Sequence, residues 1–263
     1  MITSNSNPKV KQIIQWQSKS KERRSAGIFL TEGYKMFEEA PEESIQQIFV
    51  SPDAPDKIAS RPEMSEKLDR IGYETVADDI FLRMSDTQTP QGILCVVKRP
   101  QYSLDRMLQT KDPMLVVLED IQDPGNLGTI VRTGEGAGIT GVIMSARTVD
   151  IFNPKTIRAT MGSVFRVPFI YVDDLAETMR LLHSHGIHTY SAHLKGKAFY
   201  DNLSFREATA FLIGNEGNGL TKEISGLAEN SLRIPMEGEV ESLNAAVAAS
   251  LLMYEAYRQR RNL

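Results

Sequence analysis

The most constraining feature of this sequence is the alternation of short apolar runs with amphipathic segments from residue 113 onward. The runs MLVVLED (114–120), GVIMSA (141–146) and VPFIYV (167–172) each have the length of a buried strand. Because helical segments separate them, we expect the strands to run parallel in one sheet with helices on its faces. Such sheets bind ligands at the carboxyl ends of their strands. The sequence therefore predicts an α/β fold with its site at that edge.

The same pattern extends to the end of the chain. Prolines, asparagines and aspartates mark the starts of the expected helices, and glycines mark several of their ends. Further strands are expected over 187–193, 209–215 and 232–236, and helices over 126–138, 153–163, 174–186 and from 244 to about 258.

Residues 1–98 differ in having shorter and more mixed runs. The most patterned piece, ERRSAGIFLTEGYKMFEEA, predicts a strand leading into a helix at Thr31 or Glu32. The segments 45–52 and 92–100 are interpreted as strands. We expect a first domain over 1–98, a linker with one short helix over 99–112, and the α/β domain over 113–263.

The composition indicates a soluble protein of a reducing compartment. A single cysteine, Cys95, excludes an internal disulfide. The N-terminal residues MITSNSNPKVKQ lack the apolar region of a secretory signal. No apolar run approaches the roughly 20 residues of a membrane helix. We expect a cytoplasmic protein that does not associate with membranes.

The charge distribution leaves the partner open. A net charge of −4 argues mildly against nucleic acid. The basic residues are nevertheless clustered near both ends of the chain. These clusters are either solvated termini or patches that contact phosphate groups. They are Lys9, Lys11, Lys19, Lys21, Arg23 and Arg24 near the start, and Arg258, Arg260 and Arg261 near the end.

Two motif-like patterns are set aside. GAGITG (136–141) matches a dinucleotide-binding pattern, but it follows a predicted helix and precedes a strand, the reverse of the required order. A nicotinamide-binding enzyme is thereby disfavoured. The four histidines all fall within 183–193. Since His183 and His185 point about 200° apart on a helix, we expect no metal site.

Three segments, each at a junction of strand and loop, carry the stronger signal. The first is DIQDPGNLGTIVRTGEGAG, with Asn126 and Arg132. The second is FLIGNEGNGL, where glycines surround Glu216 and let a ligand approach the backbone. The third is RIPMEGEVESLNAAVAASLLMYEAYR, with Ser242 and Asn244 before a helix of small residues. Each alone is also explained by ordinary turns and helix caps.

In this order and spacing, the three segments resemble the signature motifs of the SpoU/TrmH family of RNA 2′-O-ribose methyltransferases in the SPOUT superfamily. The resemblance covers about 113–260. The piece IFLTEGYKMFEEA is similar to the start of that family's substrate-binding domain, a small ribosomal-protein-like α/β fold. The layout is most similar to the bacterial rRNA branch of the family. One departure is that Gly134 and Gly136 follow the first motif, where the family usually has alanine.

The resemblance implies a deep trefoil knot in the second domain, S-adenosylmethionine as methyl donor without a metal, an RNA substrate and a homodimer built on the knotted domain. Catalytic-site positions carried over are Asn126, Arg132, Glu216, Ser242 and Asn244. Donor-binding positions carried over are Gly214, Ile234, Met236 and Leu243, with Ala192 as a weaker candidate. Candidates for phosphate contacts are Arg158, Arg166, Arg23 and Arg24.

Methyl transfer requires that oxygen, methyl carbon and sulfur be aligned and that the hydroxyl proton be removed. Arg132 is expected either to act as an unusual base helped by the substrate phosphate, or to clamp that phosphate and stabilise alkoxide charge. Asn126 would orient Arg132 or the ribose, and Glu216 would shape the site by holding N–H groups or another side chain. Large-subunit rRNA is the expected substrate. The alternatives are tRNA, or a non-catalytic RNA-binding protein of the same fold.

Overall fold

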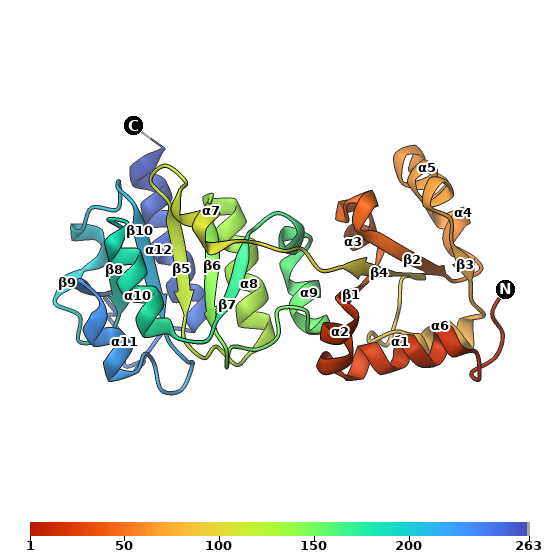
Figure 1. The fold of residues 1–263 in the computed structure, drawn as a ribbon, viewed down its shortest axis with the longest axis horizontal. Coiled ribbons are helices and arrows are strands. Elements are labelled where there is room, and N and C mark those ends of the chain that lie inside the picture. The colour runs from red at the N-terminus through yellow and green to blue at the C-terminus, as the bar shows by residue number, and fades with distance from the viewer. Residues whose placement is uncertain (262–263) are drawn as a thin grey trace. The chain divides into compact units, whose positions relative to one another are not determined.

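The computed structural model describes residues 1–261. They divide into two compact units (Figure 1). The first unit holds Met1–Gln101 and Phe152–Phe165, and the second holds Tyr102–Ile151 and the chain from Arg166 onward. The segment Phe152–Phe165, from the middle of the chain, thus groups with the first unit. The division into a domain over 1–98, a linker over 99–112 and a domain over 113–263 stays a prediction. Among the described residues, no helix has the length and apolar character needed to span a membrane.

The first unit is built on a four-stranded mixed sheet in the order β1-β4-β2-β3. β4 pairs antiparallel with both β1 and β2, and β3 pairs parallel with β2. Its elements are α1 (Pro8–Ser18), α2 (Ser20–Ala26), β1 (Ile28–Glu32), α3 (Tyr34–Glu39), the 3-10 turn η1 (Glu42–Ser44), β2 (Ile45–Val50), α4 (Ala54–Ile58), α5 (Pro62–Ile71), β3 (Glu74–Thr75), α6 (Asp78–Met84), β4 (Ile93–Lys98), α9 (Pro154–Thr160) and η2 (Ser163–Phe165).

Strand β1 shows how the first unit closes its core. Ile28 and Leu30 point into a buried cluster shared with α1 and α6. The alternate residue Phe29 points to the opposite face, where its ring lies 4.7 Å from Phe152 and 5.9 Å from Phe165 between centroids. The distant segment around α9 therefore supplies part of the hydrophobic core of this unit.

The turn between β1 and α3 corrects the expected start of the helix. The strand continues to Glu32, and the helix begins only at Tyr34. Gly33 lies between them with φ of 95°, a conformation that favours glycine. A Cβ at this position would lie 2.7 Å from Oε1 of Gln91. The helix cannot start at Thr31 or Glu32 because those residues are still paired with β4.

The second unit is a seven-stranded parallel sheet in the order β7-β6-β5-β10-β8-β11-β9, with helices on its faces. Its elements are α7 (Leu104–Leu108), β5 (Met114–Leu118), α8 (Pro124–Ala137), β6 (Gly141–Ser145), β7 (Phe169–Val172), α10 (Leu175–Ser184), β8 (His188–Ala192), β9 (Ala198–Phe199), η3 (Tyr200–Asn202), β10 (Thr209–Ile213), α11 (Lys222–Leu227), β11 (Asn230–Arg233) and α12 (Ala245–Arg260).

The predicted parallel α/β sheet is confirmed. Each of the six strands expected after residue 113 is present within a few residues of its predicted bounds, and β9 is an additional short strand at one edge. The expected helix over 153–163 is shorter, because α9 ends at Thr160. The trefoil knot concerns how the chain threads its own loops, and it stays a prediction.

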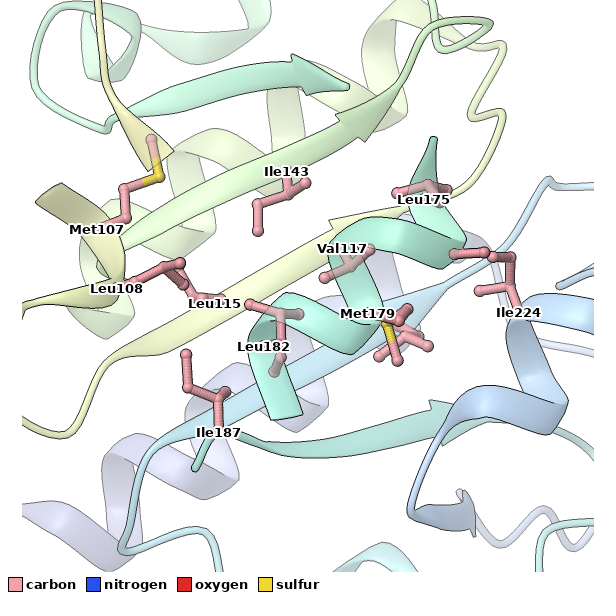
Figure 2. Close-up of a cluster of buried hydrophobic side chains, with 13 residues drawn as sticks. Met107, Leu108, Leu115, Val117, Ile143, Leu175, Met179, Leu182, Ile187 and Ile224 are labelled. Carbon is pink, nitrogen blue, oxygen red and sulfur yellow. The ribbon is translucent and has the colours of Figure 1, made fainter. Parts of the chain in front are cut away.

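One face of this sheet is covered by α10. Figure 2 shows Met179 and Leu182 of this helix in one buried cluster with Leu115 and Val117 of β5. These strand residues are two apart and therefore point to the same face. The cluster anchors the strands by apolar burial, so the loops at their carboxyl ends project from a rigid support.

Helices α8 and α12 pack against each other, and α12 also contacts β10. The two glycines that depart from the family pattern lie in this part of the unit. A Cβ at Gly134 would lie 2.3 Å from Cδ1 of Ile139, and one at Gly136 would lie 2.9 Å from the hydroxyl of Tyr254. The glycines therefore leave room for these two side chains.

Candidate active site

The first segment of the site runs from β5 into α8. After the strand, Asp120 takes a left-handed conformation with φ of 58°. The side chain of Asp123 then caps α8 by accepting a hydrogen bond from the backbone N–H of Asn126 at 2.8 Å. This cap places Asn126 in the first turn of the helix and Arg132 further along it.

Arg132 is exposed on α8. Within residues 1–261, no hydrogen bond or ion pair engages its guanidinium. A guanidinium carries five N–H donors and a permanent positive charge. Arg132 is therefore available to an anion from outside the chain, such as a phosphate group.

Glu216, in the loop after β10, joins this loop to the start of α8. Its Oε1 accepts hydrogen bonds from Nδ2 of Asn126 at 2.9 Å and from the backbone N–H of Asp123 at 3.0 Å. Its Oε2 accepts from the backbone N–H of Gln122 at 3.1 Å. Burial alone would raise the pKa of Glu216, but these hydrogen bonds outweigh burial and lower the pKa below its ordinary value. The carboxylate is therefore a hydrogen-bond acceptor for both backbone and side chain.

Asn244 adds the third segment to this network. Its Nδ2 donates to Oδ1 of Asn126 at 2.9 Å, while its own Oδ1 caps α12 by accepting from the backbone N–H of Ala246 and Val247. Both ends of the Asn126 amide are thus occupied, by Glu216 and Asn244. Asn126 makes no hydrogen bond to Arg132 in this arrangement, and it influences that arginine only through the position of α8.

The glycine loop after β10 folds tightly on itself. The side-chain oxygen of Asn215 accepts from the backbone N–H of Gly217 at 3.0 Å and of Asn218 at 3.1 Å. A Cβ at Gly214 would lie 2.1 Å from the carbonyl carbon of Gly219. Only glycine therefore permits the loop to return so close to its own start.

Sequence reasoning missed the residue that fastens the far end of this loop. Glu119 is 6% exposed, and its carboxylate accepts from both the backbone N–H and the hydroxyl of Thr221 at 2.8 Å. The only signal was an acidic residue directly after the apolar run of β5. A buried carboxylate with two donors is compatible with its surroundings, and here it links the end of β5 to the start of α11.

A cavity of about 320 Å³ opens where β8, β10 and β11 end. This volume lies within the roughly 300–1,000 Å³ of small-molecule sites. The structure brings all five predicted donor-binding residues to its wall, together with Glu216 and Ser242. The five are Ala192, Gly214, Ile234, Met236 and Leu243.

The lining suits the predicted donor. Ile234, Met236 and Leu243 offer apolar surface to a flat base, and the glycine loop offers backbone polar groups. S-adenosylmethionine combines an adenine ring with hydrogen-bonding ribose and amino-acid groups. The residues present therefore fit this cofactor. Among residues 1–261, no group of three or more histidine, cysteine or acidic side chains is placed to hold a metal ion.

The arginines predicted to contact RNA do not line this cavity. Arg158, in the first unit, forms an ion pair with Asp86 at 2.6 Å. Arg166, in the second unit, pairs with Glu135. Arg24 is exposed on α2.

Arg23 lies in the first unit and is buried, with 3% of its surface exposed. Its Nη1 donates to the carbonyl oxygens of Trp16 at 2.6 Å and Gln17 at 3.1 Å, near the end of α1. This contact joins the two N-terminal helices. We therefore leave Arg23 out of the proposed RNA contacts.

The two patterns set aside from the sequence have structural roles. The GAGITG glycines end α8 and lead into β6, with Gly138 as a left-handed cap of the helix. His183 contacts the hydroxyl of Thr189 at 2.9 Å, and His188 lies 3.1 Å from a carboxylate oxygen of Glu229. These histidines therefore serve packing and polar contacts in the second unit.

Comparison with known proteins identifies the family to which the chain belongs. Residues 113–254 match the SpoU rRNA Methylase family, and residues 7–95 match the MRM3-like substrate binding domain. The chain is 33% identical over 261 residues to the 23S rRNA (guanosine(2553)-2′-O)-methyltransferase RlmP of Bacillus subtilis, covering 96% of this chain and 97% of that protein. This chain therefore belongs to the SpoU rRNA methylase family, and the predicted family resemblance is confirmed.

Solved structures show the same fold over nearly the whole chain. The SpoU methyltransferase AviRb from Streptomyces viridochromogenes, in complex with AdoMet, matches with a TM-score of 0.85 at 28% identity, covering 96% of this chain and 98% of that one. An AdoMet-bound rRNA methyltransferase from Sinorhizobium meliloti matches with a TM-score of 0.84 at 29% identity, covering 98% and 97%. The similarity therefore includes both units.

Proposed function

We propose that this protein transfers a methyl group from S-adenosylmethionine to a ribose 2′-hydroxyl of large-subunit rRNA. The unengaged guanidinium of Arg132 carries the proposal, because a site for polyanionic RNA needs a cation that no internal carboxylate neutralises. The similarity to RlmP over both units supports rRNA as the substrate. It disfavours tRNA and a non-catalytic role as alternatives.

When bound, S-adenosylmethionine supplies a methyl group already activated by a positively charged sulfur. The protein has to align the ribose oxygen and manage its proton. Arg132 would contact the phosphate beside the reacting ribose, and either accept the hydroxyl proton or stabilise the charge that develops on the oxygen. Ser242, at the wall of the cavity, would help to orient the ribose.

The network of Glu216, Asn126 and Asn244 has a positioning role in this proposal. It ties the loop after β10 to the N-terminal ends of α8 and α12. The loop lines the donor cavity, and α8 carries Arg132. The network would therefore keep the catalytic arginine and the methyl donor in a constant arrangement.

We assign the RNA-binding role mainly to the first unit, which includes the proposed substrate-binding domain over 1–98. The match of residues 7–95 to a substrate-binding domain supports this. Lys11, Lys19, Lys21 and Arg24 are exposed around α1 and α2, and they would contact phosphates. Residues 99–112 would form the linker and 113–263 the methyltransferase domain, with the protein acting in the cytoplasm.

Mapping of ribose methylation in a strain that lacks this protein tests the function. We expect one 2′-O-methylation of large-subunit rRNA to disappear and to return when the gene is restored. Purified protein with labelled S-adenosylmethionine should then modify rRNA from that strain. Loss of a tRNA methylation with intact rRNA would overturn the rRNA assignment, and loss of neither would overturn the activity.

We also propose a homodimer through the second unit. Val247, Leu251, Tyr254 and Tyr257 of α12 are between 37% and 48% exposed, and their spacing places them along one side of the helix. Large apolar side chains clustered in this way mark interaction surfaces. A second copy of the chain would cover this stripe and bring together two sites.

Leu251→Glu should therefore weaken the dimer at least tenfold in dissociation constant, roughly the effect of a central interface change. Sedimentation of the full chain over a range of concentrations measures this. Leu82→Glu is the matched control, since Leu82 is 49% exposed on α6 of the first unit. A wild-type chain that stays monomeric, or a Leu251→Glu chain that dimerises like the control, would contradict the proposal.

A further inference from the structure

The cavity at the ends of β8, β10 and β11 has an anionic wall. Its charged side chains are Glu216 and Glu241, and neither lysine nor arginine lines it. His193 also lines it, and its Nδ1 accepts a hydrogen bond from the backbone N–H of Lys195 at 3.0 Å. The side chains that line the cavity therefore place two carboxylates, and no lysine or arginine, beside a ligand.

The two carboxylates are not equivalent. Glu216 is held by three N–H donors, which already compensate its charge. Glu241 is exposed in the segment between β11 and α12, and within residues 1–261 no hydrogen bond or ion pair engages it. Its negative charge is therefore the uncompensated one at the wall of the cavity.

Methyl transfer changes the charge of the molecule that occupies this cavity. The bond between carbon and sulfur breaks with its electron pair left on sulfur, the methyl carbon bonds to the ribose oxygen, and the hydroxyl proton is released. The donor is a sulfonium cation, whereas the demethylated product is a neutral thioether. An anionic wall consequently favours the donor. One carboxylate at about 7 Å in a water-like dielectric changes a dissociation constant about threefold.

We propose that Glu241 makes the cavity select the cationic methyl donor over its neutral demethylated product, so that the donor replaces the product when both are present. This inference rests on the proposed function, because it takes S-adenosylmethionine as the donor. Glu237 and Glu239 lie on the same segment but do not line the cavity. The selectivity is accordingly assigned to one residue of the segment and not to its overall charge.

Calorimetric titration of the full chain with S-adenosylmethionine and with S-adenosylhomocysteine tests the inference without any RNA. We expect Glu241→Gln to reduce the ratio of product to donor dissociation constants about threefold, mainly by weakening donor binding. Glu239→Gln, which removes the same charge from the same segment, should change the ratio by less than half as much. High salt should diminish the difference between wild type and Glu241→Gln.

An unchanged ratio in Glu241→Gln would overturn the inference, as would an equal change in Glu239→Gln. Thermal unfolding of both variants checks that they fold as the wild type does. A wild-type chain that binds neither ligand would overturn the proposed function itself. The two failures are therefore distinguishable in one set of titrations.

Discussion

Arg132→Ala should lower the rate of methyl transfer to RNA at least about 100-fold, the usual loss when a charge-stabilising or proton-transferring group is removed. Donor affinity should stay within about twofold of wild type, because Arg132 does not line the donor cavity. Single-turnover kinetics with labelled donor measure the first quantity, and titration with the donor measures the second.

Two further variants make this result specific. Arg180→Ala removes another exposed arginine of the second unit, on α10, and should leave the rate unchanged. Arg132→Lys keeps a positive charge but loses the planar fork of donors. If Arg132 acts as a base, the activity of the lysine variant should increase as pH rises toward the ordinary lysine pKa. If Arg132 instead clamps a phosphate, the activity of the lysine variant should depend more on the salt concentration than on pH. Substantial activity of Arg132→Ala would remove this residue from the mechanism.

Gly214→Ala should weaken donor binding at least about tenfold and lower the free energy of unfolding by about 1–3 kcal/mol, the cost of overpacking. The added Cβ would lie 2.1 Å from the carbonyl carbon of Gly219 and 2.1 Å from the backbone nitrogen of Leu220. Because these are backbone atoms, relief requires that the loop after β10 move, and this loop lines the donor cavity. Calorimetric titration and thermal unfolding measure the two effects.

Gly226→Ala is the matched control for that variant. Gly226 lies in α11, and a Cβ there meets no atom within 4 Å. Alanine favours helix relative to glycine, so this variant should bind the donor normally and unfold at the same or a slightly higher temperature. Wild-type donor binding by Gly214→Ala would show that the tight return of the loop is not needed for the site.

The sheet of the second unit was predictable because its strands β5, β6 and β10 are buried on both faces. The residues MLVVL of β5 and AFLI of β10 are continuously apolar, and such runs indicate buried strands without any tertiary information. Strand β9 has two residues and depends on pairing with β11, so the local sequence carries no signal for it. In the first unit, α4 and α6 are 5 and 7 residues long, lengths at which tertiary packing decides whether a helix forms.

Part of the candidate site was likewise predictable from the sequence, and part was not. Gly214, Ile234, Met236 and Leu243 at the wall of the cavity could be named from the family motifs, since motif positions correspond along the chain. Ala192 lies outside the three motifs and was only a weaker candidate. The hydrogen bond between Asn126 and Asn244 joins residues 118 apart in sequence. The hydrogen bond from the hydroxyl of Thr221 to Glu119 joins residues 102 apart. Such pairs depend on the strand order, which local patterns do not encode. The burial of Arg23 was missed for the same reason, because charge alone suggested an exposed residue.

The segment from Phe152 to Phe165 bears on how the chain matures during synthesis. The ring of Phe29 has two of its aromatic neighbours, Phe152 and Phe165, in this late segment. When a ribosome has made only the first 101 residues, that face of β1 still lacks the part of its cover that Phe152 and Phe165 supply. The first unit therefore completes its core only after β5, α8 and β6 of the second unit have been made. Folding of the first unit is therefore completed only after the later segment has been synthesised. A fragment that ends near residue 101 would expose apolar surface on β1 and would be prone to aggregate.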